Sequence, residues 1–187
     1  MNPSAKSPCK WKLPYISENF LHKKHANVPI VGITESWLKN YITDAQIHIK
    51  DYVPIRCDRS NRTGGGTLLY IHQEIPISDE DHYDDTICQA SLCILETIST
   101  ILINVYRPPK LSSKSLLINL LKHVQSYLDK HMDNKHYDIN IFGDFNFPNI
   151  DWESSICHPS HGRDQQLAGE ALLNFIDYNM LSQVVNT

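Results

Sequence analysis

The sequence predicts a mixed α/β fold, and three observations lead to this prediction. Several short apolar runs are rich in β-branched residues, as buried strands are. The glycine triplet Gly64–Gly66 separates two of these runs in the manner of a hairpin turn. Two longer segments repeat apolar residues with the period of a helix. Early strand pairs, then a helix, a buried strand and a second helix indicate sheets that are flanked by helices.

The strands are predicted from their apolar content and from the turn residues that bound them. Residues 1–12 are predicted to be a disordered or unrelated leader, and residues 13–187 a single domain in which 13–25 can form a short helix. The predicted strands span Val28–Thr34, Tyr52–Arg56, Thr67–His72, Ile87–Leu95, Ile98–Tyr106 and Tyr137–Phe142, and a last strand begins over Leu181–Val185.

Two amphipathic helices are predicted in the second half of the chain. Ser112 or Ser113 can cap the first, whose apolar stripe runs through Leu116–Leu128. Asp164 is the predicted cap of the second, and its apolar stripe runs through Leu167–Ile176. Each helix follows a predicted strand, so each has a sheet on which its apolar face can pack.

The composition is that of one ordinary soluble domain, with 187 residues of which 41% are hydrophobic and 20% charged. No apolar run approaches the ~20 residues that cross a bilayer, so no membrane association is predicted. The net charge of −4 argues against a protein that packages nucleic acid by bulk attraction, but it does not exclude a nuclease with an acidic metal pocket. The five cysteines form no C-x-x-C pair, which favours free thiols.

Three further patterns are interpreted as structural. The acidic stretch Asp79–Asp85 lacks the ligand spacing and the glycine of a calcium loop, so a solvated loop is predicted. Cys157, His158 and His161 lie close together, but a structural zinc site needs a fourth ligand. The glycine triplet is not followed by the Lys-Ser/Thr pair of a P-loop.

The best candidate for a functional site follows the predicted strand that ends at Phe142. Asp144 and Asn146 are two residues apart, so they can point the same way while Phe145 points into the core. Gly143 permits a close backbone approach or an unusual φ. A carboxylate beside an amide offers hard oxygen ligands to a divalent metal and a phosphate. Taken alone, the same residues also fit an ordinary turn after a strand.

Two other predicted strands end in polar side chains. Glu35 follows the first strand, and Tyr106 and Arg107 follow the fifth, where a phenol and a guanidinium can contact a phosphate. Ligands of open α/β sheets bind beyond the carboxyl ends of the strands. In isolation, Glu35 also suits a helix N-terminus and Arg107 an exposed strand end.

Four blocks of the sequence carry a resemblance when they are taken together. In order, they are Gly32-Ile-Thr-Glu35-Ser-Trp-Leu38, Arg56-x-Asp58-Arg59 with Arg62-x-Gly64-Gly65-Gly66, Val105-Tyr106-Arg107-Pro108-Pro109, and Gly143-Asp144-Phe145-Asn146-x-Pro148-x-Ile150-x-Trp152. These blocks resemble the endonuclease/exonuclease/phosphatase family, in the branch found in the polyproteins of non-LTR (LINE-type) retrotransposons. The resemblance extends over residues 13–187 and implies a DNase I-like fold, a four-layer α/β sandwich of two mixed sheets flanked by helices, of which this chain holds a part.

The resemblance implies a role for each matching residue of the candidate site. Glu35 is expected to be a ligand of Mg²⁺ or Mn²⁺, and Tyr106 to support the scissile phosphate or the attacking water. Asp144 is expected to position or activate the nucleophile, and Asn146 to hold the phosphate. Arg107 is a further candidate for phosphate contact.

Three arginines of the second block are candidates for contact with the DNA backbone, because guanidinium groups suit phosphate. They are Arg56, Arg59 and Arg62, and a solvated loop is the alternative interpretation. The implied activity is metal-dependent hydrolysis of phosphodiester bonds, in the form of DNA nicking for retrotransposition. DNA is therefore the expected partner, a reverse transcriptase domain is expected elsewhere in the polyprotein, and the nucleus is the expected place of action.

Two departures from the family pattern predict weak or absent activity. The family begins with a strand that ends in a metal-binding Asn, and residues 4–11 offer no such Asn. The family also ends with acidic and Ser-Asp-His-like segments, and the sequence reaches Thr187 before either appears. Two alternatives therefore stay open: a catalytically dead interaction module with the same fold, and a family phosphatase that acts on a small phosphoester.

Overall fold

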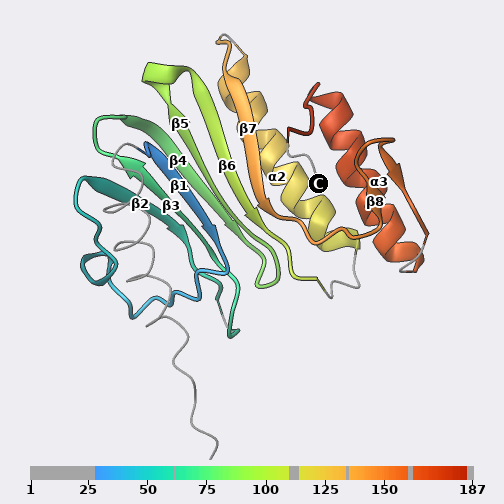
Figure 1. Ribbon diagram of the computed structural model, residues 1–187, viewed down its shortest axis with the longest axis horizontal. Helices are drawn as coiled ribbons and strands as arrows, with labels where there is room; N and C mark the ends of the chain where they lie inside the picture. Colours follow the sequence, from blue (N-terminus) through green and yellow to red (C-terminus); the bar gives the residue numbers. More distant parts are fainter. Residues whose placement is uncertain (1–27, 61, 110–113, 134, 160–161, 185–187) are drawn as a thin grey trace, which may run out of the picture.

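The computed structural model describes residues 28–60, 62–109, 114–133, 135–159 and 162–184. The predicted leader over 1–12 and the short helix over 13–25 lie outside the described residues. Within them, a three-stranded sheet packs on one face of a four-stranded sheet, and two α-helices lie on the opposite face (Figure 1). The predicted fold class, a part of a DNase I-like α/β sandwich, is confirmed.

The first sheet contains β1 (Ile30–Thr34), β2 (Tyr52–Cys57) and β3 (Thr67–His72) in the order β1-β3-β2, and both pairings are antiparallel. The central strand β3 is the most deeply buried, as its apolar run predicts. The predicted turn at Gly64–Gly66 lies in the connection between β2 and β3, so the predicted hairpin is confirmed.

The second sheet contains β4 (Ile77–Asp84), β5 (Gln89–Leu95), β6 (Thr100–Tyr106) and β7 (Asp138–Asp144), in that order. The first three strands are antiparallel, whereas β6 and β7 are parallel. Parallel neighbours need a long crossover, and here α2 (Lys114–Met132) supplies it. The crossover places the carboxyl ends of β6 and β7 at the same edge of the sheet.

The solvated loop predicted over Asp79–Asp85 was wrong, because most of this stretch is strand β4. From Ile77 to Tyr83 its side chains alternate between half-buried and exposed, and the half-buried Asp79 and Asp81 face α2. Asp79 lies 2.8 Å from His131 Nε2, and Asp81 lies 3.0 Å from His123 Nε2. Partners on a distant helix thus allow an acidic segment to form an edge strand.

Two apolar cores hold these layers together. One lies between the sheets and contains Ile55, Leu69, Ile71, Cys93, Leu95 and Leu102. The other lies between the second sheet and the helices α2 and α3 (Arg163–Tyr178). Its members include Leu92, Ile103, Leu117, Leu120, Val124 and Leu172, so both predicted helical stripes face the sheet side.

Several smaller elements complete the described chain. They are the 3₁₀ turns η2 (Asp44–Gln46) and η3 (Glu96–Ile98) and the ribbon of β8 (Ile150–Asp151) and β9 (Ile156–Cys157). Gly162, not the predicted Asp164, is the N-cap of α3; Asp164 lies in the first turn, where its charge suits the helix dipole. The predicted caps Ser112 and Ser113 lie outside the described residues.

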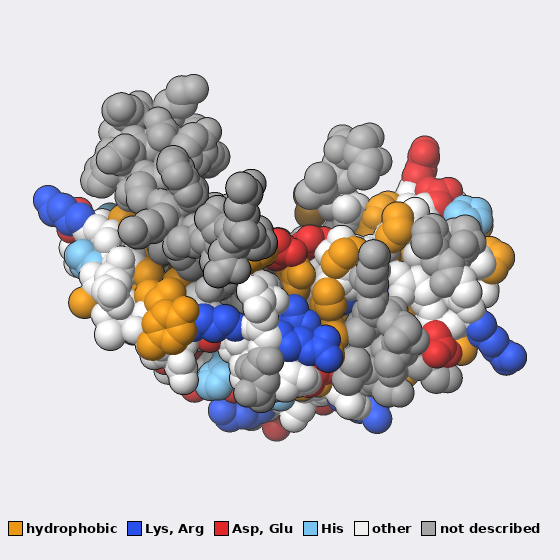
Figure 2. All heavy atoms as spheres, turned by 90° about the horizontal axis from the view of Figure 1, so that it is seen from below, with side chains coloured by type: hydrophobic (Ala, Val, Ile, Leu, Met, Phe, Trp, Pro, Cys, Tyr) orange, Lys and Arg blue, Asp and Glu red, His pale blue; other side chains and the backbone are white. Residues whose placement is uncertain are grey.

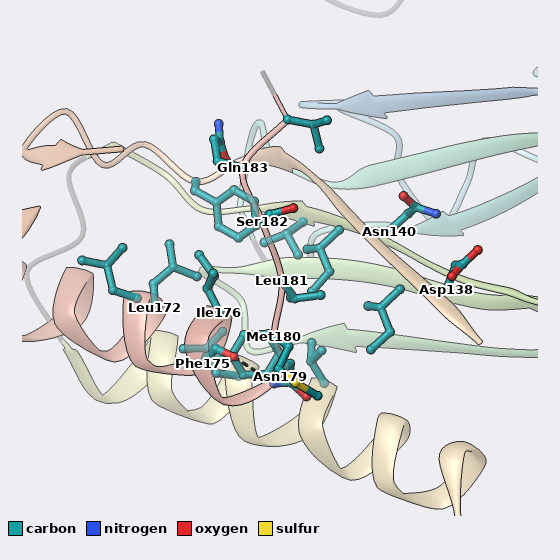
Figure 3. A pocket seen from close by; sticks show the side chains of 18 of the residues that line it. Asp138, Asn140, Leu172, Phe175, Ile176, Asn179, Met180, Leu181, Ser182 and Gln183 are labelled. Carbon is teal, nitrogen blue, oxygen red and sulfur yellow. Dashed lines mark hydrogen bonds between the residues drawn. The ribbon is translucent and has the colours of Figure 1, made fainter. Parts of the chain in front are cut away.

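A groove of about 840 Å³ opens between β7, α2, α3 and the segment that follows α3. Figure 3 shows Leu172, Phe175 and Ile176 of α3 and Leu181 of the following segment around it. Residues 181–184 have no regular secondary structure, so the predicted last strand is not seen there, and Val185 lies outside the described residues. Among the described helices, none is long and apolar enough to span a bilayer.

Candidate active site

Three strands that carry the predicted site residues end at one edge of the molecule. Tyr106 and Asp144 are opposite each other in the parallel pairing of β6 and β7. Glu35 directly follows β1 in the other sheet, and the Tyr106 hydroxyl donates a hydrogen bond to Glu35 Oε1 at 2.8 Å. The structure therefore brings Glu35, Tyr106 and Asp144 together. Figure 2 views the molecule from the side of these strand ends and shows both acidic and basic side chains on that face.

The turn that carries Glu35 has an unusual backbone. Glu35 and Trp37 have φ of 52° and 58°, in the left-handed region that non-glycine residues rarely adopt. The turn is held by the backbone of the glycine triplet, since Ser36 and Trp37 donate to the carbonyls of Gly66 and Gly65 at 3.2 and 3.0 Å. Trp37 Nε1 also donates to Glu35 Oε2 at 3.3 Å. Strain that surrounding contacts maintain is a common property of functional sites.

The Tyr106 phenol is held in its protonated form. Burial, together with the hydrogen bond to Glu35 and the charge of that carboxylate, raises the pKa of Tyr106 to about 12. Asp144 raises this pKa further and Arg59 lowers it, so both charged groups act on the phenol. Tyr106 is therefore a hydrogen-bond donor at neutral pH.

The loop after β7 depends on a glycine. Gly143 has φ of 135°, and a Cβ atom there would lie 1.9 Å from the Val105 carbonyl oxygen, so no other residue fits. Phe145 is half-buried, like Asp144 and Asn146, and packs against the core beneath the helices. The predicted contact of Phe145 with the core is thus confirmed, whereas the common direction of Asp144 and Asn146 stays a prediction. The backbone N–H of Asn146 donates to Asp144 Oδ1 at 3.2 Å, which orients the carboxylate.

Arg107 does not occupy the place expected for a phosphate contact. Its side chain is fully buried, and its guanidinium donates to the carbonyls of Phe145 and Asn146 at 3.0 and 2.8 Å. It also donates to Gln165 Oε1 at 2.5 Å and stacks 3.9 Å from the centre of the Phe147 ring. A guanidinium committed to these groups cannot reach a ligand, so the expected contact is wrong for this conformation.

The three arginines of the second block lie in different surroundings. Arg56 is paired with Asp58 and with Asp44, the latter at 2.9 Å, and serves the structure of its own loop. Arg59 is buried, donates to the Thr86 carbonyl at 2.8 Å, and acts on the Tyr106 phenol. Arg62 is exposed. Only Arg59 is tied to the strand-end site by a described interaction, so Arg56 is corrected to a structural role.

Comparison with known proteins agrees with this architecture. A family model described as endonuclease-reverse transcriptase matches residues 100–187, which include Tyr106, Asp144 and Asn146. Among solved structures, the chain resembles an AP endonuclease from Leishmania major, with a TM-score of 0.55 and 10% identity over 80% of this chain and 56% of that one. The chain has the same DNase I-like α/β fold as these solved structures.

Two further structures of this fold come from Bacteroides thetaiotaomicron. An endonuclease/exonuclease/phosphatase family protein has a TM-score of 0.51 and 14% identity over 72% of this chain and 53% of that one. A mannosyl-6-phosphatase has a TM-score of 0.51 and 13% identity over 72% of this chain and 56% of that one. The chain thus spans about half the length of each of these proteins. Comparison with curated protein sequences gives no match.

The donor atoms at the strand ends of this endonuclease/exonuclease/phosphatase fold suit a hard divalent cation. Glu35 and Asp144 supply carboxylate oxygens, and Mg²⁺ is commonly held by one or two carboxylates together with water and substrate phosphate. Within the described residues, no group of three or more His, Cys, Asp and Glu side chains can hold a metal ion. Glu35 and Asp144 are therefore the described carboxylates that would hold such a cation.

The cysteines are structural where they are described. Cys57, Cys88, Cys93 and Cys157 are free and buried, as predicted for thiols outside disulfides. Burial raises the pKa of each of the first three to about 12, so they are protonated and unreactive at neutral pH. Cys157 Sγ accepts a hydrogen bond from Asn149 rather than facing a metal, and His161 lies outside the described residues.

Two polar residues near the site were not identified from the sequence. Asn104 lies on β6, two residues before Tyr106, and its side-chain amide donates to the Ile33 and Leu68 carbonyls of the other sheet at 3.0 and 3.3 Å. Gln165 on α3 holds the Arg107 guanidinium. Buried polar residues with partners in distant segments give no local sequence signal. A single polar residue inside the otherwise apolar stretch Ile101–Val105 was the sign that the sequence offered for Asn104.

Proposed function

We propose that this chain is part of a divalent-metal-dependent endonuclease that nicks DNA, from a retrotransposon polyprotein that also contains a reverse transcriptase. The observation that carries the proposal is the contact of Glu35 with Tyr106 across the two sheets, at the strand ends that also carry Asp144. The description of the matching family, endonuclease-reverse transcriptase, supports both the nuclease and its companion domain.

Each residue has a task that its surroundings support. Glu35 would hold Mg²⁺ or Mn²⁺, and the cation would polarise the phosphate and stabilise the leaving oxygen. Tyr106 is protonated at neutral pH and donates its one hydroxyl hydrogen to Glu35 in this structure; with Glu35 on the cation, that hydrogen would turn to a phosphoryl oxygen or to the attacking water. Asp144 accepts a proton from that water. Asn146 has one amide hydrogen on the Arg107 carbonyl at 2.6 Å, and its second is suited to a phosphate oxygen.

DNA is the proposed substrate, and the nucleus is the proposed place of action. An AP endonuclease shares the fold with a TM-score above 0.5, which supports a nucleic-acid phosphodiester as the bond that is cut. Arg59 places a positive charge near the Tyr106 phenol, where it favours the approach of a phosphate anion.

Nicking of a supercoiled plasmid tests this function. The chain is incubated with the plasmid and Mg²⁺ or Mn²⁺, with and without a chelator, beside Asp144→Ala and the matched control Asp138→Ala. Asp138 is an exposed residue of the same type at the other end of β7. Because the two departures from the family pattern predict low activity, weak metal-dependent nicking that is lost only in Asp144→Ala is expected. Equal background cleavage by all three proteins would instead favour a catalytically dead interaction module, which the lack of a larger acidic cluster in the described residues also suits.

A phosphatase is the second candidate, because the mannosyl-6-phosphatase has the same fold with a similar TM-score. The two candidates differ in the bond that is cut: a phosphomonoester on a small molecule or a phosphodiester in a polymer. Release of inorganic phosphate from mannose 6-phosphate, while plasmid DNA stays intact under the same conditions, would decide for the phosphatase.

A further inference from the structure

Arg107 carries a buried positive charge without a carboxylate partner. Its side chain is fully buried, and among the ion pairs of the described residues none includes it. Burial lowers the pKa of Arg107, which shows how costly the charged form is at this position. A cation in such a place is retained where its geometry is needed, because an apolar side chain would otherwise pack there more favourably.

That geometry is directed at the loop that carries Asp144 and Asn146. The guanidinium donates to the carbonyls of Phe145 and Asn146, and the backbone N–H of Arg107 donates to the Asp144 carbonyl at 2.8 Å. In return, the Asn146 side-chain amide donates to the Arg107 carbonyl at 2.6 Å. One residue of the β6 end thus contacts the backbone of three consecutive loop residues and one of their side chains.

A second residue fixes the guanidinium itself. Gln165, buried in the first turn of α3, accepts a hydrogen bond from Arg107 at 2.5 Å, and the Phe147 ring covers the guanidinium plane. The Arg107 guanidinium thus joins the loop to α3. It is a planar group, so the directions of its N–H donors are fixed relative to one another. A rotation of the guanidinium away from Gln165 would withdraw its donors from the loop carbonyls at the same time.

We propose that Arg107 and Gln165 are a positioning pair, which holds Asp144 and Asn146 in the orientation that hydrolysis requires. The structural part of this inference rests on the hydrogen bonds above, and its consequence for catalysis rests on the proposed function. Neither residue touches the substrate. Through this pair, the position of α3 on the sheet affects the position of the Asp144 carboxylate.

Substitution of Gln165 tests the pair without removing the arginine. Gln165→Leu keeps the size of the side chain and leaves the guanidinium without its acceptor, whereas Gln165→Glu restores an acceptor and is the conservative rescue. Gln166→Leu is the matched control. It is the same substitution at the neighbouring position, and the Gln166 side chain donates to Glu170 on its own helix. Three quantities are compared: amide hydrogen exchange of residues 144–147, the thermal unfolding midpoint, and kcat and KM of metal-dependent plasmid nicking.

In Gln165→Leu, amide exchange of residues 144–147 is expected to become about tenfold faster, as loss of one hydrogen bond produces. Loss of a supporting residue typically costs 10–100-fold in activity, so kcat is expected to fall by about tenfold or more while KM changes little. Gln165→Glu should restore both quantities, and Gln166→Leu should alter neither.

Three outcomes would overturn the positioning role. The first is unchanged exchange of residues 144–147 in a folded Gln165→Leu protein. The second is faster exchange throughout the protein without a local excess, which indicates general destabilisation. The third is faster local exchange with unchanged kcat in an active protein. If the unsubstituted chain does not cleave DNA at all, the proposed function fails separately, and the exchange measurement still decides whether the pair fixes the loop.

Discussion

Acidic side chains gather at two places in this fold, and their partners differ. On β4, Asp79 and Asp81 face the basic side chains of α2, with N···O distances of 2.8 Å to His131 and 3.0 Å to His123. At the strand ends, Glu35 and Asp144 are contacted by a phenol, an indole and a backbone N–H, all of which are neutral. None of the ion pairs among the described residues includes either of these two carboxylates.

The comparison separates a structural acidic cluster from a candidate functional one. Where the chain supplies its own basic partners, the acidic residues join a strand to a helix. Where the hydrogen-bond donors are neutral, the carboxylates are oriented without forming an ion pair, which is the arrangement that the proposed cation site requires. The two clusters should therefore respond to substitution in opposite ways, one in activity and the other in stability.

The largest expected effect is on hydrolysis. Asp144→Asn keeps the shape of the side chain but cannot accept the proton of the attacking water, so the rate of plasmid nicking should fall by about 10²–10⁴-fold. The thermal unfolding midpoint should stay close to that of the unsubstituted chain. Asp81→Asn, the same change in the β4 cluster, should leave nicking unaffected, and an equal loss of activity there would break the comparison.

The next effect concerns the backbone on which the strand-end site is built. Gly143→Ala places a methyl group against the Val105 carbonyl oxygen at a φ of 135°. We expect a loss of about 2–4 kcal/mol in the free energy of unfolding, measured by urea denaturation. Gly162→Ala is a suitable control, since a methyl group there meets no atom within 4 Å although its φ of 86° is also positive. Similar losses in both variants would show that the close approach at Gly143 is unimportant.

Cation binding should distinguish the clusters directly. Glu35→Gln removes a charged oxygen ligand, and the affinity for Mn²⁺ is expected to fall by about 10–100-fold, as measured by electron paramagnetic resonance of free Mn²⁺. Asp79→Asn should leave this affinity unchanged, because its carboxylate already lies beside His131 and Lys130. Mn²⁺ binding that depends on Asp79 and not on Glu35 would reverse the assignment of the two clusters.

The smallest expected effect is in the β4 cluster itself. A double-mutant cycle of Asp79→Asn and Lys130→Gln should give a coupling free energy below about 1 kcal/mol, because partly exposed ion pairs contribute little. Thermal unfolding at low and at high salt measures it, and the coupling should shrink as salt screens the pair. A coupling that is large and independent of salt would mean that the pair is a more important part of the fold than its exposure indicates.

The sequence predicts most strands of this fold because their signals are local. The apolar runs of β1, β3, β6 and β7 are visible without any knowledge of their neighbours, and so are the polar residues directly after them. Strand β4 was missed because its pattern is Ile-Ser-Asp-Glu-Asp-His-Tyr-Asp, in which the half-buried positions are mostly acidic and gain their partners from α2. A charge pattern alone does not reveal whether a helix with histidines will cover it.

The candidate site shows the same limit at the level of single residues. A motif places Asp144 and Asn146 after a strand, and their proximity to Glu35 follows from strands that end together. The hydrogen-bond partners of Arg107 cannot be predicted in this way, because a guanidinium can donate to a phosphate or to backbone carbonyls. Its partner Gln165 lies 58 residues further along the chain. The catalytic roles themselves stay predictions until activity is measured.

A glycine determines how closely the two sheets pack near the site. β1 has Gly32 opposite Phe142 of β7, and a methyl group at Gly32 would fall 1.9 Å from a carbon of the Phe142 ring. The aromatic ring therefore rests directly on the β1 backbone, three residues before Glu35 and two before Asp144 on their own strands. An alanine at this position would push the Phe142 ring away from β1, and we expect it to move the Glu35 and Asp144 carboxylates apart. The distance between the two carboxylates thus depends on a packing contact between residues that belong to neither.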